Sequence, residues 1–278
     1  MLETEYNVTE SDFQRISEMV YRHCGINLHD GKKQLVRARI AKRLRLGGFR
    51  SLPEYLVFVE NDASGKEFTL LIDAMSTNLT SFYREPDHFH YLMEIGLVQA
   101  VDRKTRAQDR RLRLWSAGCS TGEEPYTLGM TLLDSVADAN RWDIKILATD
   151  ISTHVLKIAR NGFYGKSRVE SLPASFRSRF LEPTVIDQEK GFLIAPEVRN
   201  LIAFRHLNLM DNWPFTGPFD FIFCRNVMIY FDKPTQQRLV NRFYDVLCPG
   251  GVLFTGHSES LTGIKHSFKY IRPTVYGK

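Results

Sequence analysis

The chain has 278 residues, of which 43% are hydrophobic and 25% are charged, a balance that is typical of a folded globular protein and excludes a disordered one. No apolar run approaches the ~18 residues of a membrane-spanning helix, and the acidic, polar start lacks the features of a signal peptide, so we expect a cytoplasmic protein without membrane insertion. The net charge of +5 is concentrated between residues 32 and 50, which contain eight basic residues and no acidic one.

Residues 1–75 predict a small all-helical domain. Thr9 or Ser11 can cap a first helix, and Gly25 is placed to end it, because glycine is favoured just past a helix end. A second, basic helix is expected over residues 32–46, with a buried stripe that recurs every four residues. The residues of that stripe are Val36, Ile40 and Leu44. Two more helices are expected, after Ser51–Pro53 and over residues 65–75.

A linker over residues 76–90 precedes a different organisation in residues 91–278, where short apolar strands alternate with helices. Such alternation favours an α/β fold with a mostly parallel sheet covered on both faces. Residues from about 181 to 206 interrupt the alternation, and we expect an inserted antiparallel β-hairpin there that includes residues 201–204. The expected strands are 112–116, 144–149, 219–224, 252–255 and, at the sheet edge, 268–276.

The cysteines and histidines indicate free thiols and no metal site. The four cysteines are far apart and form no CxxC pair, and the eight histidines form no HExxH motif, whereas a zinc site needs clustered ligands. The cysteines are Cys24, Cys119, Cys224 and Cys248.

The segment LRLWSAGCSTGEEPYTLG, residues 112–129, reads as a strand, a turn at Gly118 and a helix that begins near two glutamates. Gly118 allows the backbone to approach a ligand closely. Ser120 and Glu123 have capping-box spacing, as do Thr121 and Glu124. Two carboxylates at this position would repel a pyrophosphate, but they suit the ammonium and sulfonium of S-adenosylmethionine. The alternative is that both glutamates only cap the helix.

Polar residues also follow two further predicted strands. Asp150 ends the second strand, where an acidic residue typically binds ribose hydroxyls, although it could instead cap the next helix. Arg225, Asn226 and Tyr230 follow the apolar strand of residues 219–224, and the alternative is a core strand with an ordinary loop. Because the carboxyl ends of parallel strands share one edge of a sheet, we expect these side chains to meet there.

These segments, together with TNLTSFYRE of the linker, resemble the CheR family of chemotaxis receptor methyltransferases. The matching strings are TNLTSFYRE, WSAGCSTGEEPY, ATDIS, HLNLM, CRNVMIYF and CPGGVLF, in the order of the family and spread over residues 77–255. The resemblance implies a helical N-terminal domain, a Rossmann-like class I methyltransferase domain and a small inserted β-subdomain. It implies contacts with S-adenosylmethionine from Asn78, Thr80, Arg84, Gly118, Glu123, Asp150, Asn208, Leu209, Arg225 and Asn226. Of the two neighbouring glutamates, Glu123 is expected to face the cofactor.

The resemblance also implies an activity. The methyl group of S-adenosylmethionine would pass to glutamate side chains in the cytoplasmic helical region of a methyl-accepting chemotaxis receptor, leaving S-adenosylhomocysteine. Tyr230 and Arg84 are the expected catalytic residues, which would position the acceptor carboxylate. The receptor would dock on the basic helix, since Arg39, Lys42 and Arg45 fall on a face largely opposite the buried stripe. The alternative is a solvated face without a partner. The inserted hairpin is a second possible receptor contact, because an exposed strand edge can accept a peptide.

Three alternative functions are weighed against this one. An RNA methyltransferase is suggested by the basic stretch, but the aromatic and basic interleaving of single-strand binders is absent, so we expect no nucleic acid partner. A regulatory module that binds S-adenosylmethionine without turnover is disfavoured by the full set of polar site residues. A nicotinamide oxidoreductase is disfavoured because the GxGxxG motif is missing.

Overall fold

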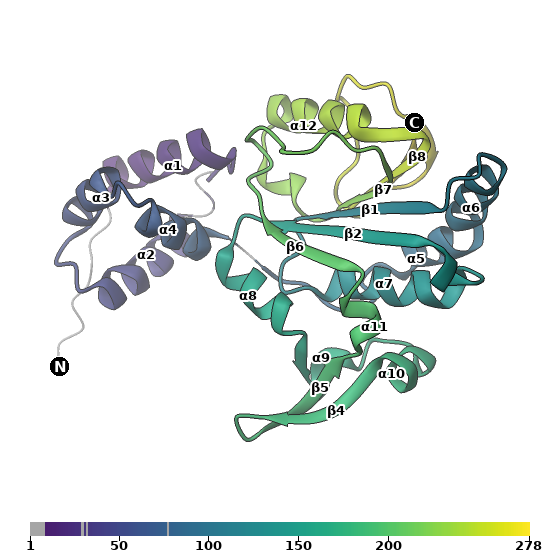
Figure 1. Cartoon of the computed structure of the whole chain (residues 1–278). Helices are drawn as coiled ribbons and strands as arrows, with labels where there is room; N and C mark the ends of the chain where they lie inside the picture. Colours follow the sequence, from purple (N-terminus) through teal and green to yellow (C-terminus); the bar gives the residue numbers. More distant parts are fainter. Residues whose placement is uncertain (1–8, 29–30, 32, 77) are drawn as a thin grey trace.

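The computed structural model describes residues 9–28, 31, 33–76 and 78–278. Lys32 of the expected basic helix and Thr77 of the expected linker lie outside these residues, as does the segment 1–8. The chain begins with four helices that lie beside a larger α/β domain (Figure 1). These helices are α1 (Glu10–Cys24), α2 (Lys33–Gly47), α3 (Leu52–Asn61) and α4 (Lys66–Met75).

Local sequence signals set the ends of these helices. Thr9 caps α1 and forms a full capping box with Asp12, and Gly25 ends the helix in the left-handed conformation, with φ of 73°. Ser51 caps α3 through the Glu54 backbone N–H. The predicted stripe of α2 is confirmed, because Val36, Ile40 and Leu44 are all buried and pack against α1, α3 and α4.

The larger domain is built on a seven-stranded sheet with the order β6-β2-β1-β7-β8-β10-β9. The first five strands in this order run parallel, and β10 and β9 add an antiparallel edge. The strands are β1 (Arg111–Ala117), β2 (Asp143–Asp150), β6 (Ile202–His206), β7 (Phe219–Cys224), β8 (Leu247–Thr255), β9 (Lys269–Arg272) and β10 (Val275–Gly277).

Helices cover both faces of this sheet, as Figure 1 shows. On one face, α12 packs through Leu239 and Phe243 against Trp115 of β1. On the other, α5 and α7 pack through Phe89 and Leu128 against the same sheet. The helices of this domain are α5 (Pro86–Tyr91), a π-helical turn (Leu92–Gly96), α6 (Leu97–Arg106), α7 (Glu123–Ser135), α8 (Thr153–Asn161), α9 (Lys166–Val169), α10 (Ala174–Phe180), α11 (Pro196–Arg199) and α12 (Lys233–Val246), with 3-10 turns at Ala139–Arg141 and Met228–Tyr230.

The insertion differs from its prediction in extent. A separate antiparallel sheet with the order β3-β5-β4 contains the expected hairpin, β4 (Leu181–Ile186) and β5 (Glu189–Ile194), together with the earlier strand β3 (Phe163–Gly165). The prediction that residues 201–204 belong to this insertion is wrong. They lie in or next to β6, which pairs in parallel with β2 and forms one edge of the main sheet. The expected single edge strand over residues 268–276 is two strands, β9 and β10, that pair with each other.

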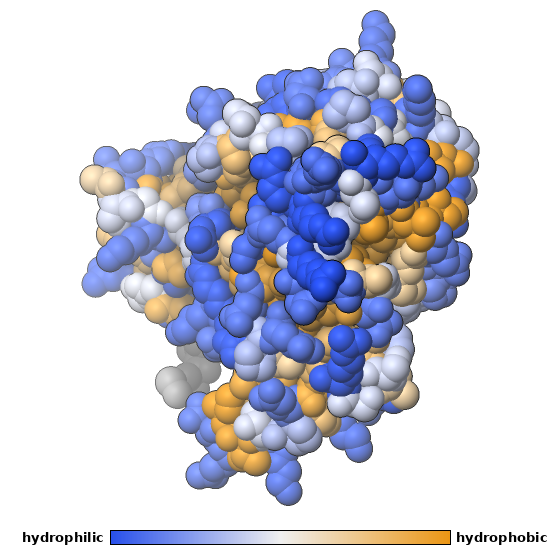
Figure 2. All heavy atoms as spheres, turned by 45° about the vertical axis from the view of Figure 1, so that its right-hand side comes forward, coloured by the Kyte–Doolittle hydropathy of each residue, from blue (hydrophilic) through white to orange (hydrophobic). Residues whose placement is uncertain are grey.

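Figure 2 shows hydrophilic side chains over most of one face, with apolar patches between them, and the lower lobe contains the β4–β5 hairpin, where Val185 and Ile186 are exposed. None of the helices in the described part of the chain combines the length and the apolar composition that crossing a membrane requires. All four cysteines are free thiols.

Candidate active site

A cavity lies where the carboxyl ends of β1, β2 and β7 meet the linker and helix α2. Parallel strands bring their carboxyl ends to one edge, and loops at that edge usually form the binding site of an open α/β sheet. Nearly all the residues singled out in the sequence line this cavity. They are Asn78, Thr80, Arg84, Gly118, Asp150, Asn208, Leu209, Arg225, Asn226 and Tyr230.

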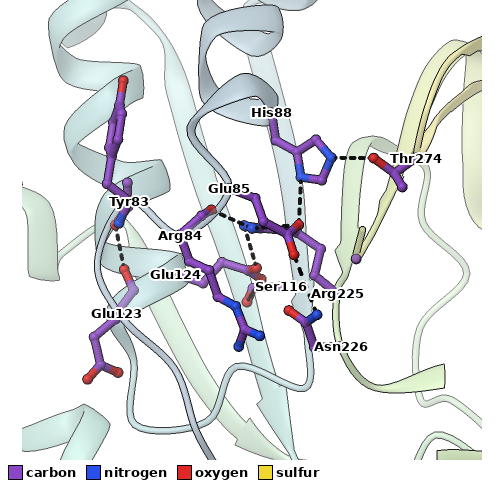
Figure 3. Close-up of polar contacts among 12 residues, drawn as sticks. Tyr83, Arg84, Glu85, His88, Ser116, Glu123, Glu124, Arg225, Asn226 and Thr274 are labelled. Atoms are coloured by element: carbon purple, nitrogen blue, oxygen red, sulfur yellow. Dashed lines mark hydrogen bonds and ion pairs between the residues drawn. The ribbon is translucent and has the colours of Figure 1, made fainter. Parts of the chain in front are cut away.

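The two neighbouring glutamates of α7 point to different sides. Glu124 lines the cavity, and its carboxylate accepts hydrogen bonds from Ser116 Oγ at 2.7 Å and from Arg225 Nη1 at 3.2 Å. Glu123 does not line the cavity; it is fully buried and forms an ion pair with Arg168, and Figure 3 shows its carboxylate pointing away from Arg225. The expectation that Glu123 is the glutamate that faces the site does not match this geometry, because Glu124 and not Glu123 lines the cavity.

Neither expected capping box forms at the start of α7. Gly122 is the N-cap, with φ of 100°, and no side chain caps the helix. Ser120 Oγ instead donates to the Asn78 carbonyl at 3.0 Å, which ties the β1–α7 loop to the linker. Gly118 is needed for packing, since its φ is +84° and a Cβ there would collide with the Val227 side chain.

Asp150 sits at the end of β2 with both carboxylate oxygens held by the backbone. Its Oδ2 accepts from the Ser120 N–H at 2.8 Å, and its Oδ1 accepts from the Ser152 N–H at 2.9 Å. Burial raises the pKa of Asp150, and these two N–H groups oppose that shift. Ser152, not Asp150, caps α8. The carboxylate therefore has a fixed orientation beside the cavity.

Arg225 is the centre of a buried ion-pair cluster. Its Nη2 lies 3.0 Å from Glu85 Oε2, its Nη1 lies 3.2 Å from Glu124 Oε2, and Nη2 also donates to the Arg84 carbonyl (Figure 3). Burial raises the pKa of Glu124, and Arg225 partly offsets this. For Glu85 the net shift has the opposite sign. Burial raises its pKa, but Arg225 and the His257 N–H lower it by more, so the pKa of Glu85 is lowered overall. The cluster joins the linker to the end of β7.

The loop that follows β7 is fixed by a second buried carboxylate. Glu259 accepts from the N–H groups of Asn226 at 2.7 Å and Ile229 at 3.1 Å. Asn226 adopts a left-handed conformation, with φ of 59°, and its side-chain Nδ2 lies 3.5 Å from Glu85 Oε1. Glu85 is itself left-handed, with φ of 57°. Non-glycine residues with positive φ store backbone strain and cluster at functional sites, so this contact joins two strained residues at the edge of the cavity.

Two predicted residues join the helical domain to the rest of the chain. Asn208 Nδ2 donates to the His23 carbonyl at 2.6 Å, so this side chain holds the end of α1 as well as lining the cavity. Arg39 was expected on the docking face of α2, largely opposite the buried stripe, but the structure places it beside the cavity. It is half-buried, lines the cavity, and donates to the carbonyls of Met75 at 2.7 Å and Ser76 at 3.1 Å. Lys42 and Arg45 are exposed, as expected.

One group of metal-type ligands lies beside the ion-pair cluster. Atoms of Glu85, His88 and His257 lie within 4.8 Å of one another. The guanidinium of Arg225 already contacts the Glu85 carboxylate, and a cation would have to displace it. Burial, followed by Arg225, lowers the pKa of His88 to about 3. The absence of a metal stays a prediction.

Sequence reasoning missed several residues that build the site. Glu85 is the last residue of the string TNLTSFYRE, and its acidic side chain directly after Arg84 was a usable signal. Glu259 lies far along the chain, and nothing local indicates that it holds the Asn226 loop. The apolar wall from the helical domain was also missed, because only tertiary packing brings it to the cavity. Its residues are Cys24, Ile26, Leu28, Leu35, Val36 and Met75.

The fold and the cavity together define a Rossmann-like α/β domain with a ligand-binding edge and an added helical domain. Residues 11–76 match the family model described as CheR methyltransferase, all-alpha domain, and residues 78–276 match CheR methyltransferase, SAM binding domain. The chain belongs to the CheR methyltransferase family. The resemblance and the fold class predicted from the sequence are both confirmed.

Curated relatives match over nearly their whole length. A chemotaxis protein methyltransferase of Borreliella burgdorferi is 40% identical over 275 residues, covering 98% of this chain and 95% of that protein. Chemotaxis protein methyltransferase 2 of Pseudomonas aeruginosa is 41% identical, covering 98% and 94%. The chemotaxis protein methyltransferase of Escherichia coli K12 is 38% identical, covering 97% and 91%.

Proposed function

We propose that this protein transfers a methyl group from S-adenosylmethionine to glutamate side chains in the cytoplasmic helical region of a methyl-accepting chemotaxis receptor. The products are glutamate methyl esters and S-adenosylhomocysteine, and the protein acts in the cytoplasm. The observation that carries the proposal is one cavity that gathers Glu124, Asp150, Asn226 and Tyr230 from three strand ends. Family membership supports the same activity.

The polar groups of the cavity fit such a donor. The Glu124 and Asp150 carboxylates suit an ammonium group and ribose hydroxyls, respectively. Burial raises the pKa of both groups, so a cation or a hydroxyl donor would stabilise their charged forms. The apolar wall of Leu28 and Val36 would exclude water from the opposite side.

S-adenosylmethionine supplies a methyl group on a sulfonium. In the transfer a glutamate oxygen forms the new O–CH₃ bond, the S–CH₃ bond breaks, and its electron pair stays on sulfur. The chain needs no strong base for this, because glutamate has a pKa of about 4.3 and is ionised at neutral pH. Its contribution is alignment of the acceptor and exclusion of water while an anion and a cation become neutral.

Tyr230 and Arg84 are the proposed positioning groups for the acceptor carboxylate. Both line the cavity. The Tyr230 backbone is fixed from the helical domain, since the Asn27 N–H donates to its carbonyl at 2.8 Å. Arg84 Nη1 donates to the Leu79 carbonyl at 2.8 Å. If Tyr230→Phe keeps full turnover and unchanged cofactor affinity, the Tyr230 hydroxyl does not position the acceptor.

Receptor docking is proposed on α2 through Lys42 and Arg45, which are exposed. Cationic side chains there would attract an acidic helical region and speed encounter. The edge strand β4 of the small sheet is a second proposed contact, because it has a partner strand on one side only within that sheet.

The test is transfer of labelled methyl from S-adenosylmethionine to a receptor cytoplasmic fragment and, in parallel, to RNA. The proposal expects label on the fragment that mild alkali releases, since carboxyl esters are base-labile. Alkali-stable label on RNA would favour a nucleic acid methyltransferase. Binding of S-adenosylmethionine without transfer to any receptor fragment would favour a regulatory module.

A further inference from the structure

Two exposed leucines line the cavity, one from the linker and one from the helical domain. Leu79 of the linker is 82% exposed and Leu35 of α2 is 45% exposed, and both line the cavity. Single exposed leucines are common on protein surfaces and need no explanation. Here, however, both leucines are exposed to solvent and also line the cavity that is proposed to hold the methyl donor.

Leu79 is held in place by its backbone. Its own carbonyl accepts from Arg84 Nη1 at 2.8 Å, and the carbonyl of Asn78 before it accepts from Ser120 Oγ at 3.0 Å. The linker is therefore anchored to residues of the site on both sides of the side chain. A contact surface that is ordered before binding loses less conformational entropy when a partner arrives.

Leu35 is fixed relative to the same linker. Arg39 lies one turn further along α2 and donates to the carbonyls of Met75, at the end of α4, and Ser76, the first residue of the linker. The face of α2 that begins at Leu35 continues through Lys42 to Leu46, at spacings of seven and four residues. Lys42 is exposed, and Leu46 is 71% exposed. This face therefore offers apolar and cationic groups side by side.

Resting on the proposed function, we infer that Leu35 and Leu79 form an apolar rim that binds the receptor segment carrying the acceptor glutamate. The preferred segment is acidic and has apolar side chains beside the acceptor. Those side chains pack on the rim, while the acidic ones face the cations of α2. The rim thus selects which glutamates of an acidic helix are modified, and the cations alone do not make this selection.

The experiment compares the full chain with Leu79→Ser, Leu35→Ser and Leu79→Met in methyl transfer to a receptor cytoplasmic fragment. Val98→Ser on α6 is the matched control, because Val98 is 61% exposed and does not line the cavity. We expect KM for the fragment to rise about tenfold in both serine variants, given the apolar area that each leucine would bury. In both serine variants we expect KM for the fragment to rise more than the Kd for S-adenosylmethionine changes, and we expect Leu79→Met to keep KM within about twofold of that of the unsubstituted chain.

Two results would overturn the inference while the proposed function stands. An unchanged KM in both serine variants would show that the rim does not bind the acceptor segment. A Kd for S-adenosylmethionine that rises in parallel with KM would make Leu79 a cofactor contact. Thermal unfolding of each variant identifies loss of fold. If a serine variant unfolds, KM of Leu79→Met shows whether an apolar side chain of similar size is sufficient at this position. No transfer by the unsubstituted chain to any receptor fragment would instead overturn the proposed function and the inference together.

Discussion

The helical domain and the β3-β5-β4 insertion are both additions to one Rossmann-like sheet, but they stand in different relations to the cavity. Helices α1 and α2 contribute an apolar wall and Arg39, whereas the described lining includes no residue from β3, β4 or β5. The insertion is attached on the other side of α7, where Arg168 pairs with Glu123 and Tyr164 Oη donates to the Thr121 carbonyl at 2.6 Å. The helical domain is thus part of the site. The insertion lies beside the site, and loss of its contacts with α7 should leave cofactor binding intact.

The largest expected difference separates the two adjacent glutamates. Glu124→Gln should weaken S-adenosylmethionine binding by roughly ten- to a hundredfold, because a hydrogen bond to a charged group contributes about 1.5–3 kcal/mol. Glu123→Gln should leave the Kd within about twofold and lower the melting temperature, because it breaks the buried contact with Arg168. Calorimetry and thermal unfolding of both variants measure this. If both variants lost the same affinity for S-adenosylmethionine, the assignment of Glu124 to the cavity side of α7 and Glu123 to the insertion side would be contradicted.

A second comparison uses one arginine from each addition. Arg39→Met removes two hydrogen bonds that connect α2 to the linker, so binding of S-adenosylmethionine should weaken by about tenfold. Arg168→Met removes the contact of the insertion with α7 and should not change that affinity. The measurement is again the Kd, with thermal unfolding as the control for folding. A stronger effect from Arg168→Met would reverse the roles assigned to the two additions.

The pH dependence of S-adenosylmethionine binding should come from the two carboxylates that line the cavity, Glu124 and Asp150. Burial raises the pKa values of Glu124 and Asp150, so without ligand these groups contribute stability at low pH that is lost as pH rises through those values. A cationic ligand prefers their charged forms, and affinity should therefore fall severalfold as pH is lowered, beginning above the ordinary carboxyl pKa of about 4.3. Calorimetric titrations at roughly one-unit steps between about pH 8 and about pH 5 measure this dependence. The slope should diminish in Glu124→Gln, and an identical slope would exclude Glu124 as its source.

The smallest expected effect concerns the outer face of α2. Charge reversal at Lys42 and Arg45 should raise KM for a receptor fragment by about threefold at low salt and by less at high salt, since exposed charges contribute little each and are screened. Both residues are exposed, so S-adenosylmethionine binding should not change. Steady-state transfer at two salt concentrations measures it. A KM unaffected at low salt would leave Lys42 and Arg45 without a docking role.

The sequence was sufficient to predict those features of the fold whose signal is local and periodic. The buried stripe of Val36, Ile40 and Leu44 and the caps at Thr9 and Gly25 depend on neighbours in the chain, and the structure has them as predicted. The polar ends of β1, β2 and β7 were also predictable, because parallel strands bring their carboxyl ends together. Asp150, Asn226 and Tyr230 accordingly line one cavity.

The errors arise where a contact with a distant segment decides the outcome. Successive residues of a helix point about 100° apart, so the sequence alone does not decide which of Glu123 and Glu124 meets Arg225. Arg39 borders the buried stripe of α2, and only the position of the Met75 and Ser76 carbonyls explains why it is half-buried beside the cavity. Residues 201–204 form a short apolar run, and its pairing with β2 is non-local.

The most direct measurement is a crystal structure of the full chain with S-adenosylhomocysteine. The account predicts the ligand between α2 and the carboxyl ends of β1, β2 and β7, in contact with Glu124, Asp150 and Asn226, with the Glu123–Arg168 pair undisturbed. A ligand bound against Glu123 and the β-insertion, or anywhere that leaves the interdomain cavity empty, would contradict it.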